Sequence, residues 1–411
     1  MNIWLINHYA VPPSLYPLAR TTNFAKYLIR AGHTVTIFAA STVHNSDKNL
    51  IGDKSPYRAE TVEGIPYVYV RATPYQGNGK KRILNMFQFA HRVKRVCKRF
   101  LKPDAILSSS ATPFAAMAGV KLAKKYRRPG VVEITDLWPE SFVAYHLIRP
   151  GNPALKLMYR YEKRLYQKAD AVIFTMEGGK DYIIEKGWDK RISLEKIYHI
   201  NNGVDLEVFL KNQQDNPVSD PDLDDPETKK VVYAGSLRLV NDAGVLLDAA
   251  KETAVRDAAV RFIIYGTGDQ LEALQVRCME ENIGNVIFKG YVNKKYIPAI
   301  LAKADINIIH VMQTDIMRYG SSLNKEFEYL ASGKPILSDL VCGYDLLTKY
   351  DVGLTVERQE ASLIVDGILR LLDMPEDEKQ AMAERAQAVA ADYDFKALTE
   401  KLLKVIENYS R

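Results

Sequence analysis

Short apolar runs alternate with longer segments of helical spacing along the first half of this 411-residue chain. The apolar runs span residues 2–7, 34–40, 104–108, 130–135 and 171–175. Between the first two, Phe24, Leu28 and Ile29 recur on one helical face. Apolar runs joined by amphipathic helices are typical of a buried parallel sheet, so the pattern predicts a doubly wound α/β domain.

The same alternation begins again after a polar interval. Residues 211–228 are rich in Asp, Asn and Pro and have no apolar period, which is typical of a linker. New apolar runs follow at residues 231–234, 260–265, 286–291 and 353–356. We therefore predict a first Rossmann-like domain at 1–203, a linker at 204–228, a second Rossmann-like domain at 229–391 and a terminal helix at 392–411.

The composition is that of an ordinary globular protein, with 47% hydrophobic and 26% charged residues. Its length allows two cores of roughly 200 residues each. No apolar run approaches the roughly 18 residues that span a bilayer, and the first apolar run is too short and uncharged for a signal peptide. The three cysteines are scattered, which suits a reducing compartment. These features predict a cytoplasmic protein.

Charge is distributed unevenly along the chain. Residues 1–203 hold 32 basic and 15 acidic residues, a net +17, whereas residues 204–411 hold 24 basic and 35 acidic residues, a net −11. The whole chain has a formal net charge of +6 at pH 7. One domain is therefore expected to face an anionic surface or acceptor.

The strongest basic segment is residues 80–102, with nine Lys or Arg and no acid. An apolar stripe is predicted along it at Ile83, Phe87, Ala90, Val93, Val96, Cys97 and Phe100. Two interpretations stay open: a core-facing helix with a solvated basic face, or a helix bound to anionic lipid, where each basic residue contributes roughly 1 kcal/mol. No helix-turn-helix, zinc or aromatic ribonucleoprotein pattern accompanies the charge, so nucleic acid is not an expected partner.

The segment with the most specific chemistry is residues 318–339, RYGSSLNKEFEYLASGKPILSD. Apolar residues recur in it at helical spacing until Gly333, and small residues open it at Gly320, Ser321 and Ser322. Free amides at such a helix start suit a phosphate, and Glu326 and Glu328 can accept hydrogen bonds from sugar hydroxyls. A capped surface helix is the alternative.

This segment closely resembles the nucleotide-sugar site of the retaining glycosyltransferases of the two-domain GT-B type, in the glycogen-synthase-like family 4. The resemblance implies that Glu328 holds the ribose hydroxyls. The family often has a second Glu eight residues earlier, for the donor sugar, where this chain has Gly320. The string SLNKEFEY resembles subfamilies that assemble surface polysaccharides.

The resemblance implies further donor-site residues in the second domain. Arg238, in a turn like the family's phosphate loop, and Lys325 are expected to face the donor diphosphate; Ala243 stands where a Lys is often found. The other expected donor-site residues are Gly235, Ser236, Gly266, Thr267, Gly268, Tyr291, Val292, Ser321, Ser322 and Asn324.

In the first domain the strings HYA and DLWPES resemble the same branch of the family. They place His8, Tyr9, Trp138 and Glu140 among the acceptor residues, with Arg20 as a nearby charge. Asp136 follows an apolar strand and is expected to orient or activate an acceptor hydroxyl. The alternatives are a rigid proline-bearing loop for the first string, and a capping Asp with a core Trp for the second.

The family implies a GT-B fold, with the terminal helix crossing back to the first domain, and transfer with retention. We predict Asp136, Arg238 and Lys325 as catalytic residues, a UDP-sugar as donor, and a saccharide or polyprenyl-diphosphate-linked saccharide as acceptor at the cytoplasmic side of a membrane. No cofactor and no obligatory metal are expected; the Asp-rich string at 220–225 lies in the polar linker. A non-catalytic nucleotide-sugar-binding protein and a nucleotide-sugar epimerase or hydrolase remain as alternatives.

Overall fold

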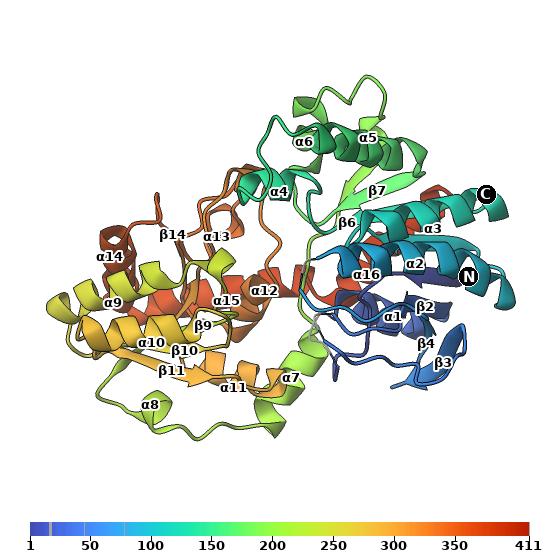
Figure 1. Ribbon diagram of the computed structural model, residues 1–411. Coiled ribbons are helices and arrows are strands. Elements are labelled where there is room, and N and C mark those ends of the chain that lie inside the picture. Colours follow the sequence, from blue (N-terminus) through green and yellow to red (C-terminus); the bar gives the residue numbers. More distant parts are fainter. Residues whose placement is uncertain (16–18, 45, 78, 411) are drawn as a thin grey trace. The chain divides into compact units, whose positions relative to one another are not determined.

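The computed structural model describes residues 1–15, 19–44, 46–77 and 79–410. The chain forms two compact units, coloured in chain order in Figure 1. Unit 1 is Met1–Asn201 with Phe395–Arg411, and unit 2 is Asn202–Asp394. The chain thus leaves unit 1 near the predicted end of the first domain and returns to it at its terminal helix.

Unit 1 is built on an eight-stranded sheet in the order β3-β4-β2-β1-β5-β6-β7-β8. All neighbours are parallel except the antiparallel pair β3 and β4. The strands are β1 (Asn2–Ile6), β2 (Thr34–Ala40), β3 (Tyr57–Val62), β4 (Ile65–Val70), β5 (Ala105–Ser109), β6 (Gly130–Ile134), β7 (Ala171–Phe174) and β8 (Ile197–His199). The order reverses at β1, where the two halves of a doubly wound sheet meet.

Helices cover this sheet, and its central strands β1, β5 and β6 are buried on both faces. They are α1 (Arg20–Arg30), α2 (Lys80–Val96), α3 (Pro113–Tyr126), α4 (Glu140–Ala144), α5 (Pro153–Lys168), α6 (Gly179–Glu185) and α16 (Phe395–Asn408). Pro113 occupies the first turn of α3, where its missing N–H costs nothing. The terminal helix α16 packs beside α1, with the rings of Phe24 and Phe395 edge to face at 5.6 Å.

The apolar stripe predicted for residues 80–102 was partly wrong. Ile83 and Phe87 are 50% and 52% exposed, and Met86 and Phe89 are buried in their place. The predicted Ala90, Val93, Val96 and Cys97 are buried, as expected. The prediction therefore failed in the first half of α2, whose buried face differs from the predicted one, and held in the second half. It ends at Val96, and Cys97–Arg99 continues as a 3₁₀ turn.

Unit 2 contains a six-stranded, fully parallel sheet in the order β11-β10-β9-β12-β13-β14. The strands are β9 (Lys229–Ala234), β10 (Val260–Tyr265), β11 (Val286–Gly290), β12 (Ile306–Ile309), β13 (Ile336–Ser338) and β14 (Leu354–Thr355). Its core joins the buried faces of β9, β10 and β12 to helices α9 and α14. The order reverses between β9 and β12, so ligands are expected at their carboxyl ends.

The helices of unit 2 include two within the predicted linker. They are α7 (Leu206–Asp215), α8 (Pro221–Asp224), α9 (Gly244–Arg256), α10 (Leu271–Glu280), α11 (Ile297–Ala302), α12 (Asn324–Ser332), α13 (Leu346–Tyr350), α14 (Ala361–Leu372) and α15 (Glu376–Asp392). Asp205 caps α7 and Asp220 caps α8 through their side chains. Among the described helices, none is long and apolar enough to cross a membrane.

Candidate active site

Helix α12 is fixed to the carboxyl end of β9 by one tyrosine. The hydroxyl of Tyr329 accepts a hydrogen bond from the backbone N–H of Ala234 at 3.0 Å. The helix ends at Gly333, which has φ +64°, a conformation that suits glycine. At its other end Leu323 precedes it, and no side chain caps its first turn. The start of α12 therefore retains backbone donors for an anion.

Lys325 lies in this first turn and faces the loop after β9. Its Nζ donates to the carbonyl oxygen of His310 at 3.3 Å and lies 4.1 Å from the centre of the Tyr233 ring. A Cβ atom built on Gly235 would be only 2.7 Å from the same Nζ. Gly235 therefore leaves room for the ammonium group, and the structure brings together two of the predicted donor residues.

The two glycine-bearing loops at this edge pack directly on one another. A Cβ atom at Gly266 would be 1.7 Å from the carbonyl oxygen of Gly235, and one at Gly268 would be 2.0 Å from that of Leu237. The backbone N–H of Leu237 also donates to the carbonyl of Thr267. These glycines are required by the packing of the loops themselves.

The other predicted donor residues of these loops line the same edge of the sheet. Ser236, Arg238 and Thr267 are exposed beyond β9 and β10, and Tyr291 is 76% exposed beyond β11. Val292 beside it is half-buried. Ala243, at the position where the family often has Lys, is buried at the start of α9.

Glu328, predicted to bind ribose, forms an ion pair with Lys294 at 2.9 Å. Lys294 begins the 3₁₀ turn that follows β11 and Val292. The negative charge of Glu328 raises the pKa of Lys294. A ribose that binds Glu328 must therefore either share the carboxylate with Lys294 or displace the lysine from it.

Glu326 has different surroundings. Its side chain is buried, and its Oε2 accepts a hydrogen bond from the hydroxyl of Ser321 at 3.0 Å. Desolvation raises the pKa of Glu326 to about 7. Gly320, directly before Ser321, has φ +99°, a conformation that residues with a side chain rarely adopt. The family carboxylate that Gly320 replaces therefore does not fit this backbone without strain.

Two further residues of the segment have distinct positions. Asn324 is exposed at the first residue of α12. Ser322 is tied to the motif at the start of unit 2, because its hydroxyl accepts from the backbone N–H of Asn202 and its carbonyl accepts from the Asn202 amide at 2.7 Å. Asn202 thus holds the loop that precedes α12.

An open depression of about 550 Å³ lies beside this helix start, beyond β13 and β14. Cys342, Asp345 and Lys349 are among the residues that line it. Cys342 receives a hydrogen bond from the backbone of Ser321, and the charge of Asp345 acts on Glu326. The depression therefore adjoins the Ser321–Glu326 pair.

In unit 1, His8 is completely buried, which contradicts its predicted contact with an acceptor. Its Nε2 lies 2.6 Å from Oδ1 of Asn85, and its ring packs on Phe89 of the same helix α2. Burial lowers the pKa of His8 to about 3, so the ring is neutral. His8 holds α2 against β1 and is not a surface ligand.

Arg82, identified in the sequence only as part of the basic helix, binds Tyr9 and acts electrostatically on Asp136. Nε of Arg82 donates to the hydroxyl of Tyr9 at 3.2 Å. Desolvation raises the pKa of Asp136, while Thr135 and the charge of Arg82 oppose that rise. The carboxyl edge of the unit 1 sheet therefore holds a carboxylate within the electrostatic influence of a guanidinium that binds a phenol.

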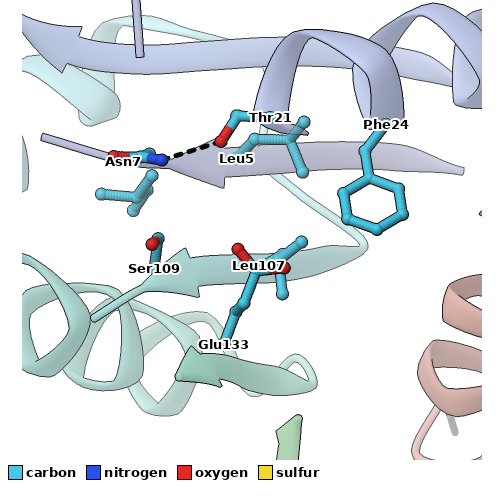
Figure 2. Close-up of a pocket in the computed structure, with 8 residues that line it drawn as sticks. Leu5, Asn7, Thr21, Phe24, Leu107, Ser109 and Glu133 are labelled. Atoms are coloured by element: carbon cyan, nitrogen blue, oxygen red, sulfur yellow. Dashed lines mark hydrogen bonds between the residues drawn. The ribbon is translucent and has the colours of Figure 1, made fainter. Parts of the chain in front are cut away.

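Arg20, predicted as a charge near the acceptor, is occupied inside unit 1. Its Nε donates to Glu133 on β6 at 2.8 Å, and its other nitrogens bind the carbonyls of Ile200 and Asn201. Beside this ion pair lies a cavity of about 10 Å³, lined by Asn7, Thr21 and Glu133 among others (Figure 2). It has room for about one water molecule. Arg20 therefore anchors the end of the first segment of unit 1, at Ile200 and Asn201, and is not available to a substrate phosphate.

Glu140 is likewise occupied by neighbours, contrary to its predicted acceptor role. It pairs with Lys186 of α6 and accepts from the hydroxyl of Tyr159 on α5 at 2.6 Å. Trp138 is half-buried and packs edge to face on Phe142 at 4.4 Å. The second half of DLWPES therefore ties helices together, and Asp136 is its chemically accessible carboxylate.

Comparison with known families matches both halves of the chain. Residues 19–208 match the family described as Glycosyltransferase Family 4, and residues 228–374 match the one described as Glycosyl transferases group 1. The chain is a glycosyltransferase of the family 4 type. A relative in Bacillus subtilis, TuaH, is named as a glycosyltransferase of teichuronic acid biosynthesis; it is 25% identical over 339 residues, 78% of this chain and 79% of TuaH.

Solved structures share the fold of this glycosyltransferase over nearly its whole length. Sucrose-phosphate synthase of Thermosynechococcus elongatus has a TM-score of 0.71 at 16% identity, over 99% of this chain and 98% of that one. HepE of Anabaena, in complex with UDP, has a TM-score of 0.68 at 16% identity, over 99% of this chain and 100% of HepE. A trehalose-6-phosphate protein of E. coli, bound with UDP-2-fluoro glucose, has a TM-score of 0.73 at 12% identity, over 99% of both chains. With the two parallel-dominated sheets, these likenesses establish the GT-B fold.

Several residues near the candidate site of this glycosyltransferase were not predicted from the sequence. Lys294 and His310 contact the predicted residues Glu328 and Lys325 but lie outside the motifs quoted above. Tyr329 lies within FEYLASGKP and was not singled out there, although its hydroxyl binds the backbone of Ala234. Arg82 was identified only by its charge. Tyr329 stands next to Glu328, and a polar ring on the buried face of a helix is a sequence signal for a buried hydrogen bond.

The Asp-rich string of the predicted linker has partners of its own. Lys289 pairs with both Asp220 and Asp222, and Lys303 pairs with Asp224. The Lys289 pairing helps to lower the pKa of Asp220 against desolvation, and Lys303 lowers that of Asp224. In the structure these carboxylates join helix α8 to the rest of unit 2.

Proposed function

We propose that this glycosyltransferase moves a sugar from a UDP-sugar to a hydroxyl of a lipid-linked saccharide, with retention of configuration and without an obligatory metal, in the assembly of a surface polysaccharide. Two comparisons support the donor and the pathway. HepE is described in complex with UDP, and TuaH is named for teichuronic acid biosynthesis.

One observation carries the proposed donor site. A cation, a carboxylate that can bind ribose and the uncapped N–H groups of a helix start lie at the same edge of the unit 2 sheet. Lys325 faces Gly235, and Glu328 lies one helical turn further along α12. Arg238 is exposed on the loop that starts at Gly235. This set matches a nucleoside diphosphate, with phosphates at the helix start and ribose at Glu328.

The transfer needs charge stabilisation more than a nucleophile from the protein. The oxygen of the acceptor hydroxyl forms a bond to the anomeric carbon as the bond from that carbon to the diphosphate oxygen breaks. The hydroxyl proton passes to the departing phosphate oxygen on the same face. Lys325, Arg238 and the amides of α12 stabilise the negative charge that develops on the diphosphate. Asp136 of unit 1 orients the acceptor hydroxyl.

A surface of unit 1 supports a lipid-linked acceptor. Ile83, Leu84 and Phe87 are each about half exposed on α2, and we call these three the α2 apolar face. Phe87 stacks on Phe114 of α3 at 4.1 Å. Lys80, Lys81 and seven further basic residues lie in the same segment. Exposed apolar groups among cations suit the boundary of an anionic bilayer.

The decisive experiment compares UDP, GDP, ADP and their sugar conjugates in thermal-shift assays of the wild type and Glu328→Ala. A ligand at 100 times its dissociation constant stabilises by about 2.7 kcal/mol, so binding is readily detected. We expect a shift with UDP compounds that Glu328→Ala removes. Absence of any shift at millimolar concentration contradicts the donor site.

The alternatives differ in turnover once donor binding is established. A transferase releases UDP from its donor only when a suitable acceptor is added. Release without an acceptor identifies a hydrolase or epimerase. Binding with no release under any acceptor identifies a non-catalytic nucleotide-sugar-binding protein, which the backbone of Gly320 favours because it excludes the family's donor-sugar carboxylate.

A further inference from the structure

His310 lies at the carboxyl end of β12 and is completely buried. Its Nδ1 is 2.6 Å from Oδ2 of Asp339, the residue that follows β13. Its Nε2 is 2.9 Å from the carbonyl oxygen of Asp242, in the turn before α9. One ring therefore connects the ends of two strands to a loop that is about 70 residues away in the sequence.

The hydrogen-bond partner of Nε2 determines whether this nitrogen of the His310 ring carries a proton. A carbonyl oxygen can only accept, so Nε2 carries a proton and donates it to Asp242. Nδ1 shares a second proton with Asp339, on the nitrogen or on the carboxyl group. Gln359 approaches the same nitrogen at 3.5 Å. The other oxygen of Asp339 is buried without a hydrogen-bond partner among the described residues, so the contact with His310 is needed to offset the cost of burying this group.

The Asp242 turn belongs to the proposed phosphate loop. Arg238 opens the 3₁₀ turn Leu239–Asn241, and Asp242 closes it with φ +49°. The hydroxyl of Ser236 contacts Asn241 in the same turn at 3.1 Å. The position of the Asp242 carbonyl therefore controls the backbone that carries Arg238 and Ser236.

His310 also contacts the second cation of the site. Its own carbonyl oxygen accepts from Nζ of Lys325 at 3.3 Å. The ring and the backbone of one buried residue thus reach both segments that bear the proposed phosphate ligands.

We infer that His310, oriented by Asp339, is a positioning residue for the donor diphosphate: its ring holds the Arg238 turn, and its carbonyl holds Lys325. This inference rests on the proposed function, since it takes these two cations as diphosphate ligands. His310 does not touch the substrate. It acts through the placement of the two positive charges.

The test measures the binding of UDP and of uridine to His310→Phe by titration calorimetry. Phenylalanine keeps the ring volume but loses both hydrogen bonds, so we expect UDP affinity to fall at least about tenfold while uridine affinity changes less than about twofold. Asp339→Asn can still donate to Nδ1 and is expected to keep UDP affinity within about threefold of the wild type. Equal losses for UDP and uridine, or no loss for UDP, overturn the inference.

A matched control and a second variant keep the test decisive. Asn307→Leu alters another buried polar residue of β12, whose amide contacts Leu301 and Ser332 instead of the phosphate loop. It is expected to lower stability without changing the ratio of UDP to uridine affinity. If His310→Phe does not fold, Asp339→Ala removes the orienting bond and should show the same selective loss. A wild type that binds no UDP overturns the proposed function itself, which is a different result from a variant that binds it normally.

Discussion

The two carboxylates of α12 differ because of what each one contacts. Glu328 is paired with Lys294, whereas Glu326 is buried with only a hydroxyl as its hydrogen-bond donor among the described contacts. One carboxylate therefore has its charge balanced before any ligand arrives. The other is held partly protonated near neutral pH, because desolvation raises its pKa to about 7.

Lys294→Met tests whether Lys294 competes with the nucleotide for Glu328. The lysine side chain is about half exposed, and exposed ion pairs contribute about 0–1 kcal/mol. We expect uridine affinity to rise, by at most about fivefold, since the ribose no longer competes with an ammonium group. A fall in affinity would show instead that Lys294 binds the nucleoside. Lys295→Met, at the exposed neighbouring position, is the control.

Gly320→Glu restores the residue type that the family often has, and we expect it to destabilise unit 2. With φ +99° and ψ 168°, Gly320 lies in a region that residues with a Cβ atom almost never adopt, at a cost of about 1–3 kcal/mol. Gly284→Ala is the control, because no atom lies within 4 Å of a Cβ built there and its φ is not positive. Chemical unfolding of both variants measures the difference. Unchanged stability of Gly320→Glu would mean that the backbone relaxes without cost.

At the scale of elements, α5 and α6 are joined through a buried acid. Glu162 of α5 accepts hydrogen bonds from the hydroxyls of Tyr166 at 2.7 Å and Tyr182 at 2.9 Å. Desolvation raises its pKa to about 8, despite these two donors and the charge of Lys186. The folded protein therefore keeps a proton here that the unfolded chain releases above its ordinary carboxyl pKa.

This proton predicts how the stability of unit 1 depends on pH. Between about pH 4.5 and 8 the folded state binds more protons at Glu162 than the unfolded state, so the free energy of unfolding falls as pH rises, by up to about 1.4 kcal/mol per pH unit. Glu162→Gln, which stays neutral, should remove this part of the slope. Urea unfolding at pH 5, 6.5 and 8 measures it, with Asp189→Asn, an exposed acid of unit 1, as the control. Equal slopes in the wild type and Glu162→Gln would contradict the prediction.

At the scale of the whole molecule, charge divides between the two halves of the chain, whereas both units expose apolar side chains. The first half of the chain carries the basic excess, and the α2 apolar face lies within it. Unit 2 also exposes apolar side chains, such as Val255 and Met279, but in the acidic half of the chain. Only the first combination offers both contributions to binding an anionic bilayer.

The triple variant Ile83→Ser, Leu84→Ser and Phe87→Ser removes the α2 apolar face. We expect it to sediment with anionic vesicles at least about tenfold less than the wild type. Each large apolar side chain that is buried in the bilayer contributes about 1.5–3 kcal/mol to binding. Charge removal at Lys94, Arg95, Lys98 and Arg99 should reduce binding further and weaken its dependence on salt. Val255→Ser with Met279→Ser, which are 86% and 70% exposed, is the control. Unchanged sedimentation of both α2 variants would refute membrane binding by this helix.

Several features of this glycosyltransferase follow from the sequence alone. The alternation of apolar runs and amphipathic segments predicted both doubly wound sheets, because strands buried on two faces need continuous apolar residues. The segment around FEYLASGKP marked α12, since its stop signal and apolar spacing are local properties. The carboxyl ends of the strands likewise pointed to the edge of the unit 2 sheet at which Gly235, Arg238 and Thr267 lie.

Only the tertiary structure decided which charged residues have partners. Arg20 pairs with Glu133, 113 residues away, and Glu140 with Lys186, 46 residues away, so neither is available to an acceptor. The orientation of α2 on its sheet, which exposes Phe87 and buries Phe89, depends in the same way on packing between distant segments. Periodicity and motifs describe neighbours along the chain, whereas the charge that a site can offer depends on neighbours in space.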